Sequence, residues 1–340
     1  MTDGKAVTIH DVAQKAGCSP SLVCIAFSGK GRIGAKTKER ILAVAEEMGY
    51  TPNRAAQSLS RKEITIGVII PRSPAVVQDL LRDNLIATLE QDNMRRCKCL
   101  MIQYDSTEES KLQALRQIDE KIDGIILEMK EPETEQLAQE LAKLAENNKP
   151  VVGLVTSPSA VPVAGQVSVD IAITAGMAAQ ILYMNGCTRV GVIAGEQDSE
   201  LHARMVQAFA RACEQEGLVF EKVEYTDDLP EKAYLLTQNM LQQDSPPDGI
   251  FVTNYCSPMV CRAIEECGFV ESIKVVGVDL CDEIRTLLKN GQLLATLYQN
   301  QSDQARKAGQ HLLDYILHQT ESKQINIKPE LVLRSNMDSY

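Results

Sequence analysis

A glycine-rich hexapeptide is the first place where this sequence could bind a cofactor. Residues 29–34, Gly-Lys-Gly-Arg-Ile-Gly, match the GxGxxG pattern that lets a backbone approach a dinucleotide pyrophosphate. The pattern requires the apolar run before it, residues 22–27, to be a strand. Ser19 and Pro20 are instead typical of a helix N-terminus, and no later strand supplies a clear ribose-binding acid. An NAD-dependent enzyme is therefore the disfavoured alternative, and no cofactor is expected.

Other catalytic and metal-binding patterns are missing from the sequence. It contains no nucleophile elbow, Walker loop or HExxH motif. Its histidines, at positions 10, 202, 311 and 318, are isolated, so each is expected to be a surface or capping residue. The ten cysteines form no CxxC pair, although Cys97 and Cys99 would share one face of a strand. We expect neither catalytic residues nor a metal ion, and hence no enzyme.

The net charge of −11 is unevenly distributed along the chain. Residues 1–62 contain ten Lys and Arg against five Asp and Glu, whereas the remainder contains 25 basic and 41 acidic residues. A basic head on an acidic body is typical of a small DNA-contacting module attached to a larger domain. The N-terminus is too polar for a signal peptide, and no run of about 18 apolar residues could span a membrane. We therefore expect a cytoplasmic protein with no membrane partner.

The first sixty residues predict three short helices. Thr8 and Asp11 have the spacing of a capping box before a helix over about residues 9–16, which Gly17 ends. Ser19 then caps a second helix, and a third begins near residue 35 and ends at Gly49. Three short helices around one small core are typical of a helix-turn-helix head, whose second helix enters the DNA major groove.

Two sets of residues in this head are candidates for DNA contacts. The second helix turns Leu22, Val23, Ala26 and Phe27 inward, which leaves Pro20, Ser21, Cys24, Ile25 and Ser28 facing outward. Basic residues gather around the start of the third helix and could hold phosphates: Lys30, Arg32, Lys36, Lys38 and Arg40.

These residues carry a specific resemblance. The segments Val7 to Ala13, Gly17 to Ser19, Ser28 to Arg32, Gly49 to Ala56, and Ser58-Leu59 resemble the head of the lactose-repressor family in order. The resemblance implies that residues 53–60 form a hinge helix, which folds on the operator and inserts Leu59 into the minor groove. The DNA contacts implied are Thr8, Ser19, Pro20, Ser21, Cys24, Ile25, Ser28, Lys30, Arg32, Asn53, Arg54, Ala56, Gln57 and Leu59.

Two positions depart from the family pattern. Cys24 replaces a hydroxyl that often meets phosphate, and Ile25 stands where many relatives have arginine. An isoleucine cannot make the bidentate contact to guanine that discriminates most strongly between bases. Three interpretations follow: apolar contact with thymine methyls, specificity carried by the hinge and by DNA shape, or a degenerate head that has lost DNA binding.

From residue 64 onward, short apolar segments alternate with amphipathic ones. Strands are predicted over residues 65–70, 98–103, 124–127, 151–154, 190–194, 249–252 and 275–278. Helices are predicted over residues 76–95, 107–120, 133–147, 172–185, 200–216, 231–243 and 258–267. This alternation predicts an α/β body of two doubly wound parallel-sheet subdomains, because the units are too many for one ordinary sheet.

The body resembles the periplasmic binding protein fold that forms the sensor of the same family, on segments such as Ile66 to Val68, Val190 to Gly195 and Val276 to Asp279. The predicted domains are a head at 1–52, a hinge and linker at 53–63, and a core at 64–340. Within the core the N-subdomain is expected at about 64–169 and 300–324, and the C-subdomain at about 170–298 and 327–340. The chain would cross between subdomains near residues 168–171, 297–302 and 322–329.

Polar residues that follow strands are the candidates for a ligand site, because ligands of open α/β sheets lie beyond the carboxyl ends of the strands. Asn254, Asp279 and Gln299 match family residues that bind sugar hydroxyls, and Ser73 and Arg204 complete the candidate set. Three places depart from the family's ligand-binding pattern. Arg204 is one place away from the family's ligand-clamping arginine, Asp170-Ile171 replaces an Asp-Asn pair, and Tyr255 stands where an acid is common.

The resemblance as a whole implies a transcription regulator, expected to be a repressor, that binds a pseudo-palindromic operator as a homodimer. Its expected partners are the double-stranded DNA operator and a small-molecule effector, sugar or related, in the cleft between subdomains. The alternative is a small-molecule-binding protein whose DNA head is degenerate.

Overall fold

The computed structural model describes residues 7–28, 32–50, 63–72, 76–90, 97–105, 107–129, 134–147, 149–155 and 163–340. The chain divides into two compact units, Met1–Glu63 with Asp92–Arg96, and Ile64–Gln91 with Cys97–Tyr340. We call them the head and the body and describe each by itself.

The head contains the three predicted helices, α1 (Ile9–Ala16), α2 (Pro20–Ser28) and α3 (Ala35–Glu47). The predicted capping box is present at α1. The Thr8 backbone N–H donates to Asp11 Oδ2 over 2.8 Å, and the Asp11 N–H donates to Thr8 Oγ1 over 3.4 Å. Gly17 ends α1 at a φ of 61°, a left-handed conformation that glycine adopts without steric cost.

The three helices close around one apolar cluster. Val12, Val23 and Ile41, one from each helix, are completely buried in it. Phe27 packs edge-on against Tyr50, with ring centroids 5.7 Å apart. The inward stripe predicted for α2 is therefore confirmed, since it is the stripe that fills this core.

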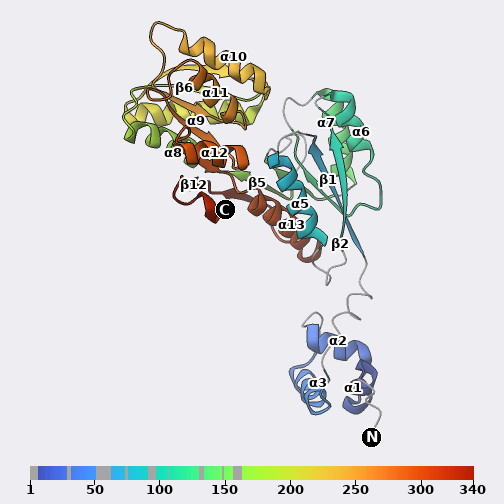
Figure 1. Ribbon diagram of the computed structural model, residues 1–340. Coiled ribbons are helices and arrows are strands. Elements are labelled where there is room, and N and C mark those ends of the chain that lie inside the picture. Colours follow the sequence, from blue (N-terminus) through green and yellow to red (C-terminus); the bar gives the residue numbers. More distant parts are fainter. Residues whose placement is uncertain are drawn as a thin grey trace. The chain divides into compact units, whose positions relative to one another are not determined.

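The body contains two six-stranded sheets (Figure 1). The first has the order β11-β5-β4-β3-β1-β2, and all of its neighbouring strands run parallel. Helices α5 and α13 contribute to the apolar cluster on one face, and α6 and α7 to the cluster on the other. The bounds are β1 (Ile64–Pro71), β2 (Cys97–Tyr104), β3 (Gly124–Leu127), β4 (Val151–Leu154), β5 (Gly165–Val169), β11 (Lys323–Ile327), α5 (Val76–Glu90), α6 (Glu108–Arg116), α7 (Glu135–Glu146) and α13 (Gln301–His318).

The second sheet has the order β12-β10-β9-β8-β6-β7, parallel except for β12, which runs antiparallel to β10. Helices α8 and α9 cover one face, and α10, α11 and α12 the other. The bounds are β6 (Arg189–Ala194), β7 (Val219–Tyr225), β8 (Gly249–Val252), β9 (Lys274–Val278), β10 (Ala295–Tyr298), β12 (Glu330–Val332), α8 (Ile171–Met184), α9 (Glu200–Glu216), α10 (Pro230–Leu241), α11 (Ser257–Glu266), α12 (Asp282–Asn290) and the 3-10 helix η1 (Met337–Ser339).

The chain passes between the sheets three times in the body: after β5, after β10 and between β11 and β12. The three predicted crossings overlap these points. One boundary needs correction: the first sheet extends to Ile327, beyond the predicted residue 324, because β11 pairs with β5 from Lys323↔Gly165 to Ile327↔Val169.

All seven predicted strands are present, but the sequence did not predict β5, β7, β10, β11 or β12. These strands lack a continuous apolar run. β7, for example, is at the edge of its sheet and has a mostly exposed or half-buried sequence, Val-Phe-Glu-Lys-Val-Glu-Tyr. Among the described residues, no helix is long and apolar enough to cross a membrane.

Candidate functional site

Helix α2 carries the candidate base-reading face of the head. Ser21 and Cys24 are exposed, and Pro20 and Ile25 are half-buried. The opposite side of the helix is held in the core by Val23 and Ala26, so the outward set is fixed by the 3.6-residue period. That this outward set faces the DNA major groove stays a prediction.

Two predicted DNA contacts already have local roles. The Ser19 Oγ accepts from the Leu22 N–H over 3.3 Å at the start of α2, and the Thr8 hydroxyl donates to Asp11 Oδ2 over 2.6 Å. Both residues are nevertheless exposed, as is Arg32. Several other predicted contacts lie outside the described residues: Lys30, Asn53, Arg54, Ala56, Gln57 and Leu59 of the head and hinge, and Ser73 of the body. Ser28 ends α2, and its side chain belongs to the same undescribed set.

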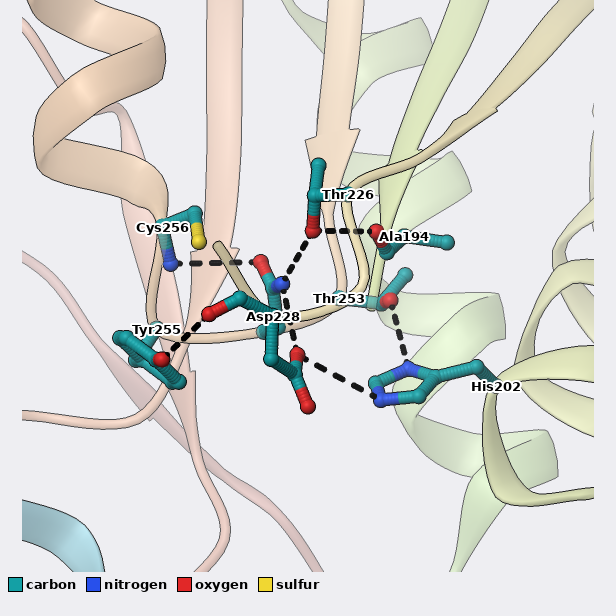
Figure 2. Close-up of polar contacts among 8 residues, drawn as sticks. Ala194, His202, Thr226, Asp228, Thr253, Tyr255 and Cys256 are labelled. Carbon is teal, nitrogen blue, oxygen red and sulfur yellow. Dashed lines mark hydrogen bonds and ion pairs between the residues drawn. The ribbon is translucent and has the colours of Figure 1, made fainter. Parts of the chain in front are cut away.

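In the body, polar residues gather where β6, β7 and β8 end (Figure 2). Asn254, just after β8, donates from Nδ2 to Thr226 Oγ1 over 3.0 Å and to Asp228 Oδ1 over 2.9 Å. Its Oδ1 accepts from the Cys256 N–H over 3.2 Å. The predicted sugar-binding amide is thus bound to its own chain through both donor hydrogens, and it holds the Asp228 carboxylate in place.

His202 is the second support of Asp228. It lies on α9, with Nδ1 3.2 Å from Thr253 Oγ1 and Nε2 4.0 Å from Asp228 Oδ1. The expectation that His202 is a surface or capping residue is wrong, because the side chain is buried against the ends of two strands. The sequence did contain a signal: His202 occupies the same helical stripe as the buried Met205, Val206 and Phe209. His311 is likewise buried, with Nε2 2.9 Å from the Ala164 carbonyl oxygen.

Gly195, directly after β6, leaves the space that these two side chains fill. A Cβ atom at this position would lie 2.2 Å from His202 Nε2 and 2.5 Å from Asp228 Oδ1. Tyr255 also contacts Asp228: its hydroxyl donates to the Asp228 carbonyl oxygen over 2.5 Å. Burial, with the charges of Cys256 and Asp228 second, raises the pKa of Tyr255 to about 12, so this hydroxyl keeps its proton at neutral pH.

Asp279 and Gln299, both predicted ligand residues, are in contact. Gln299 Nε2 donates to Asp279 Oδ1 over 3.2 Å, and Gln301 Nε2 donates to the same oxygen over 2.8 Å. The pKa of Asp279 is raised to about 6. Burial is the largest cause, the hydrogen bond from Gln301 lowers the pKa, and the charge of Asp228 raises it. Asp228 and Asp279 are therefore close enough to repel each other electrostatically. Sequence reasoning did not identify Asp228 or Gln301.

Arg204 lies apart from this group. Its side chain is 56% exposed and its Nη1 is 3.8 Å from Glu200 Oε1 on the previous turn of α9. Together with Ile171 and Leu201 of the second sheet's helices, it lines a cavity of about 120 Å³ whose other walls are Val155, Gln166 and Ser168 of the first sheet. Asp170 caps α8 by accepting from the Ile173 N–H over 3.1 Å. Arg204 therefore faces the space between the sheets, and it lies two residues after His202 on α9.

Comparison with known proteins covers both units. A family model described as bacterial regulatory proteins of the lacI family matches residues 8–53, and one described as a periplasmic binding protein domain matches residues 66–320. Catabolite control protein A of Priestia megaterium is 29% identical over 288 residues, which are 80% of this chain and 82% of that protein.

Two solved structures share the fold. GanP, a glucose-galactose binding protein from Geobacillus stearothermophilus, matches with a TM-score of 0.73 at 17% identity and covers 82% of this chain and 99% of its own. The lac repressor dimer bound to operator and the anti-inducer ONPF matches with a TM-score of 0.69 at 20% identity and covers 98% and 99%. The first match covers about the extent of the body, and the second covers almost the whole chain.

Proposed function

The chain belongs to the lacI family of bacterial regulatory proteins, and from this premise we propose that it is a sequence-specific transcription regulator. The proposal is that it acts as a repressor in the cytoplasm, and that a homodimer binds a pseudo-palindromic operator. The observation that supports it most is helix α2, which follows a capped tight turn and leaves Ser21 and Cys24 exposed while its other face is buried.

We further propose that the body senses a small molecule, sugar or related, in the cleft between its two sheets. The carboxyl ends of the second sheet's strands supply Asp279 and Gln299, and Arg204 lines the cavity toward the first sheet. A ligand that binds a closed arrangement better than an open one shifts the population toward closure. In a dimer, that shift changes the spacing of the two heads and hence the affinity for operator.

The names of two relatives support the proposed role in transcription regulation. One relative is named catabolite control protein A, and the lac repressor structure is a dimer bound to operator and the anti-inducer ONPF. These relatives are regulators, which favours regulation over catalysis for this chain. The same comparison disfavours a dinucleotide enzyme at residues 29–34, a segment that belongs to the matched lacI region.

The test is selection of duplexes from a random pool by the purified full-length chain, without effector. We expect enrichment of a pseudo-palindrome whose affinity falls steeply with salt. Ile25→Arg should add a guanine preference at one position of each half-site, because arginine can bind guanine O6 and N7 together. Ile25→Val is the matched control and should keep the wild-type consensus.

A folded, dimeric protein that enriches no duplex would contradict the proposal. That result would instead support the alternative, a small-molecule-binding protein with a degenerate head.

A further inference from the structure

The residues that follow the strands of the second sheet are strongly acidic. Glu196 and Asp198 follow β6, Asp227 and Asp228 follow β7, and Asp279 follows β9. These segments, residues 195–199, 226–229, 253–256, 279–281 and 299–300, are all described and contain no lysine or arginine. Lys232 on α10 is paired with Asp227, with its Nζ 2.5 Å from Asp227 Oδ2. The edge therefore has a negative potential, which its low-dielectric surroundings strengthen.

The first sheet offsets this charge only in part where the structure describes it. Its strands are followed by Arg72 after β1, Asp105 after β2, Glu128 after β3, Asp170 after β5 and the exposed Lys328 after β11. Arg72 is already paired, with its Nη1 3.3 Å from Asp105 Oδ1. An anionic ligand at this edge would thus meet carboxylates from both sheets.

A second observation, independent of charge, comes from the first turn of α13. Gln301 is only 5% exposed, and its Nε2 donates to Asp279 Oδ1 over 2.8 Å, yet its Oε1 has no hydrogen-bond partner. Gln304, one turn on and 3% exposed, donates from Nε2 to the Gln299 carbonyl oxygen over 2.8 Å, and its Oε1 also has no partner. Two buried acceptors at the start of α13 therefore lack a donor, and one of them belongs to the amide that contacts Asp279.

The orientation of the Gln301 amide follows from its neighbour. Rotating the amide by half a turn would place Oε1 against the Asp279 carboxylate, and two acceptors repel. The carboxylate thus fixes Nε2 toward itself and leaves Oε1 unpaired. A buried amide oxygen without a donor costs free energy, and such groups in native proteins usually indicate a missing water, ion or ligand.

We infer that the effector of the proposed regulator carries a protonated primary amine, which binds at Asp279 and Gln301 beside Asp228. An ammonium group has three donors and no acceptor, so it can serve the second carboxylate oxygen of Asp279 and the unpaired Gln301 oxygen together. Both amides that contact Asp279 donate to Oδ1, which leaves Oδ2 for this ligand. A neutral hydroxyl compound lacks the charge, and a phosphorylated one has the wrong sign. This inference rests on the proposed function of the cleft.

Asp228 has a supporting role in this site. Asn254 donates to its Oδ1, His202 lies 4.0 Å from the same atom, and the carboxylate retains 20% exposure. Its position is therefore set before a ligand arrives, and little reorganisation is needed when a cation binds. Asp228 contributes by its charge, while Asp279 and Gln301 contribute direct hydrogen bonds.

Isothermal titration of the full-length protein tests the inference. The probes are three hexosamines (glucosamine, galactosamine and mannosamine) with putrescine, the neutral hexose matched to each amino sugar, and glucose 6-phosphate. We expect at least one amine to bind at least about tenfold more tightly than its neutral counterpart, as is typical of a hydrogen bond to a charged group. Glucose 6-phosphate should bind more weakly than either.

Variants locate the site. Asp279→Asn should weaken binding of that amine by about tenfold or more, whereas Asp244→Asn, which removes the same charge from an exposed loop, should change it less than about twofold. Gln301→Met keeps the length and removes the amide, so it provides a second test if Asp279→Asn fails to fold. Circular dichroism and thermal unfolding verify that each variant is folded.

The inference is overturned if no amine binds, if the neutral or phosphorylated sugar binds as tightly, or if both Asp279→Asn and Gln301→Met retain wild-type amine affinity. The duplex selection is run without effector, so its outcome does not depend on whether an amine binds. Enrichment of an operator without amine binding would reject the effector class alone, whereas amine binding without any operator would reject the proposed regulation.

Discussion

Asp228 and Asp279 are held by side chains that sequence reasoning assigned to other roles or did not identify. Asn254, which was expected to bind ligand, donates both amide hydrogens to Thr226 and Asp228. His202, expected on the surface, is buried beside the same carboxylate. The consequence is an acidic edge in which the two carboxylates are supported by a layer of polar groups, the kind of arrangement that a precise binding site requires.

The titration of Asp279 gives a prediction for this residue. Its pKa rises from 3.8 in an unfolded chain to about 6 in the folded protein, so the folded state binds the proton more tightly. The buried charge is therefore a destabilising contribution, fully present above pH 6 and relieved as the pH falls through 6 toward 4. Asp279→Asn removes it. We expect the free energy of unfolding of the variant, relative to wild type, to be higher at pH 7.5 than at pH 4.5 by about 2 kcal/mol.

Denaturant titrations of both proteins at the two pH values measure this difference. A difference that does not depend on pH would show that Asp279 has an ordinary pKa in the folded chain.

At the level of elements, the head depends on its helix ends. Helix α1 has eight residues, which is too short to be stable alone, so its cap and its packing must hold it. Thr8 and Asp11 satisfy two amide donors that the first turn would otherwise leave unpaired. Since α1 packs against α2 in the head's only described core, its stability also affects the placement of the base-reading face.

Thr8→Ala is the corresponding prediction. Loss of the capping oxygen should destabilise α1 by about 1 kcal/mol, which corresponds to roughly fivefold faster exchange of its protected amides. Hydrogen exchange of the full-length protein, read by mass spectrometry over residues 9–16, measures the change. Thr8→Ser retains the hydroxyl and serves as the control. Equal exchange in the two variants would mean that packing alone maintains the helix.

For the molecule as a whole, the division of charge is the dominant property. The head is basic while the remainder is acidic enough to bring the net charge to −11, so the body repels DNA and attracts cations. DNA affinity must then come from the phosphate contacts of the head. Lys36 and Arg40 are exposed on α3 and are proposed among these contacts.

The salt dependence of DNA binding measures these phosphate contacts. Lys36→Ala and Arg40→Ala should each reduce the slope of log K against log salt by about 1 for the selected duplex, without changing the preferred sequence. Arg116→Ala is the control: this arginine lies on α6 of the body, with Nε 3.3 Å from Glu140 Oε1, and should leave the slope unchanged. An equal change in slope for all three variants would indicate a general charge effect rather than contacts by the head.

The features that arise from neighbours along the chain were predictable from the amino-acid sequence. The capping box at Thr8, the left-handed Gly17, the inward stripe of α2 and the seven apolar strands all depend on side chains within a few residues of one another. The family resemblance of the head is of the same kind, since it covers consecutive residues. Alternation of strands and helices was likewise sufficient to predict parallel sheets, because parallel strands need helical connections.

Contacts between polar residues far apart in the sequence became known from the folded chain. Asp228 contacts Asn254 from 26 positions away, and Asp279 contacts Gln301 from 22 positions away, across the passage from β10 to α13. β7 and β11 are strands because they pair at the edges of existing sheets, and their own residues carry little signal. A hydrogen bond between distant residues depends on the path of the whole backbone, which local spacing does not specify. The acidic edge was therefore visible as separate carboxylates in the sequence and became one site only through the fold.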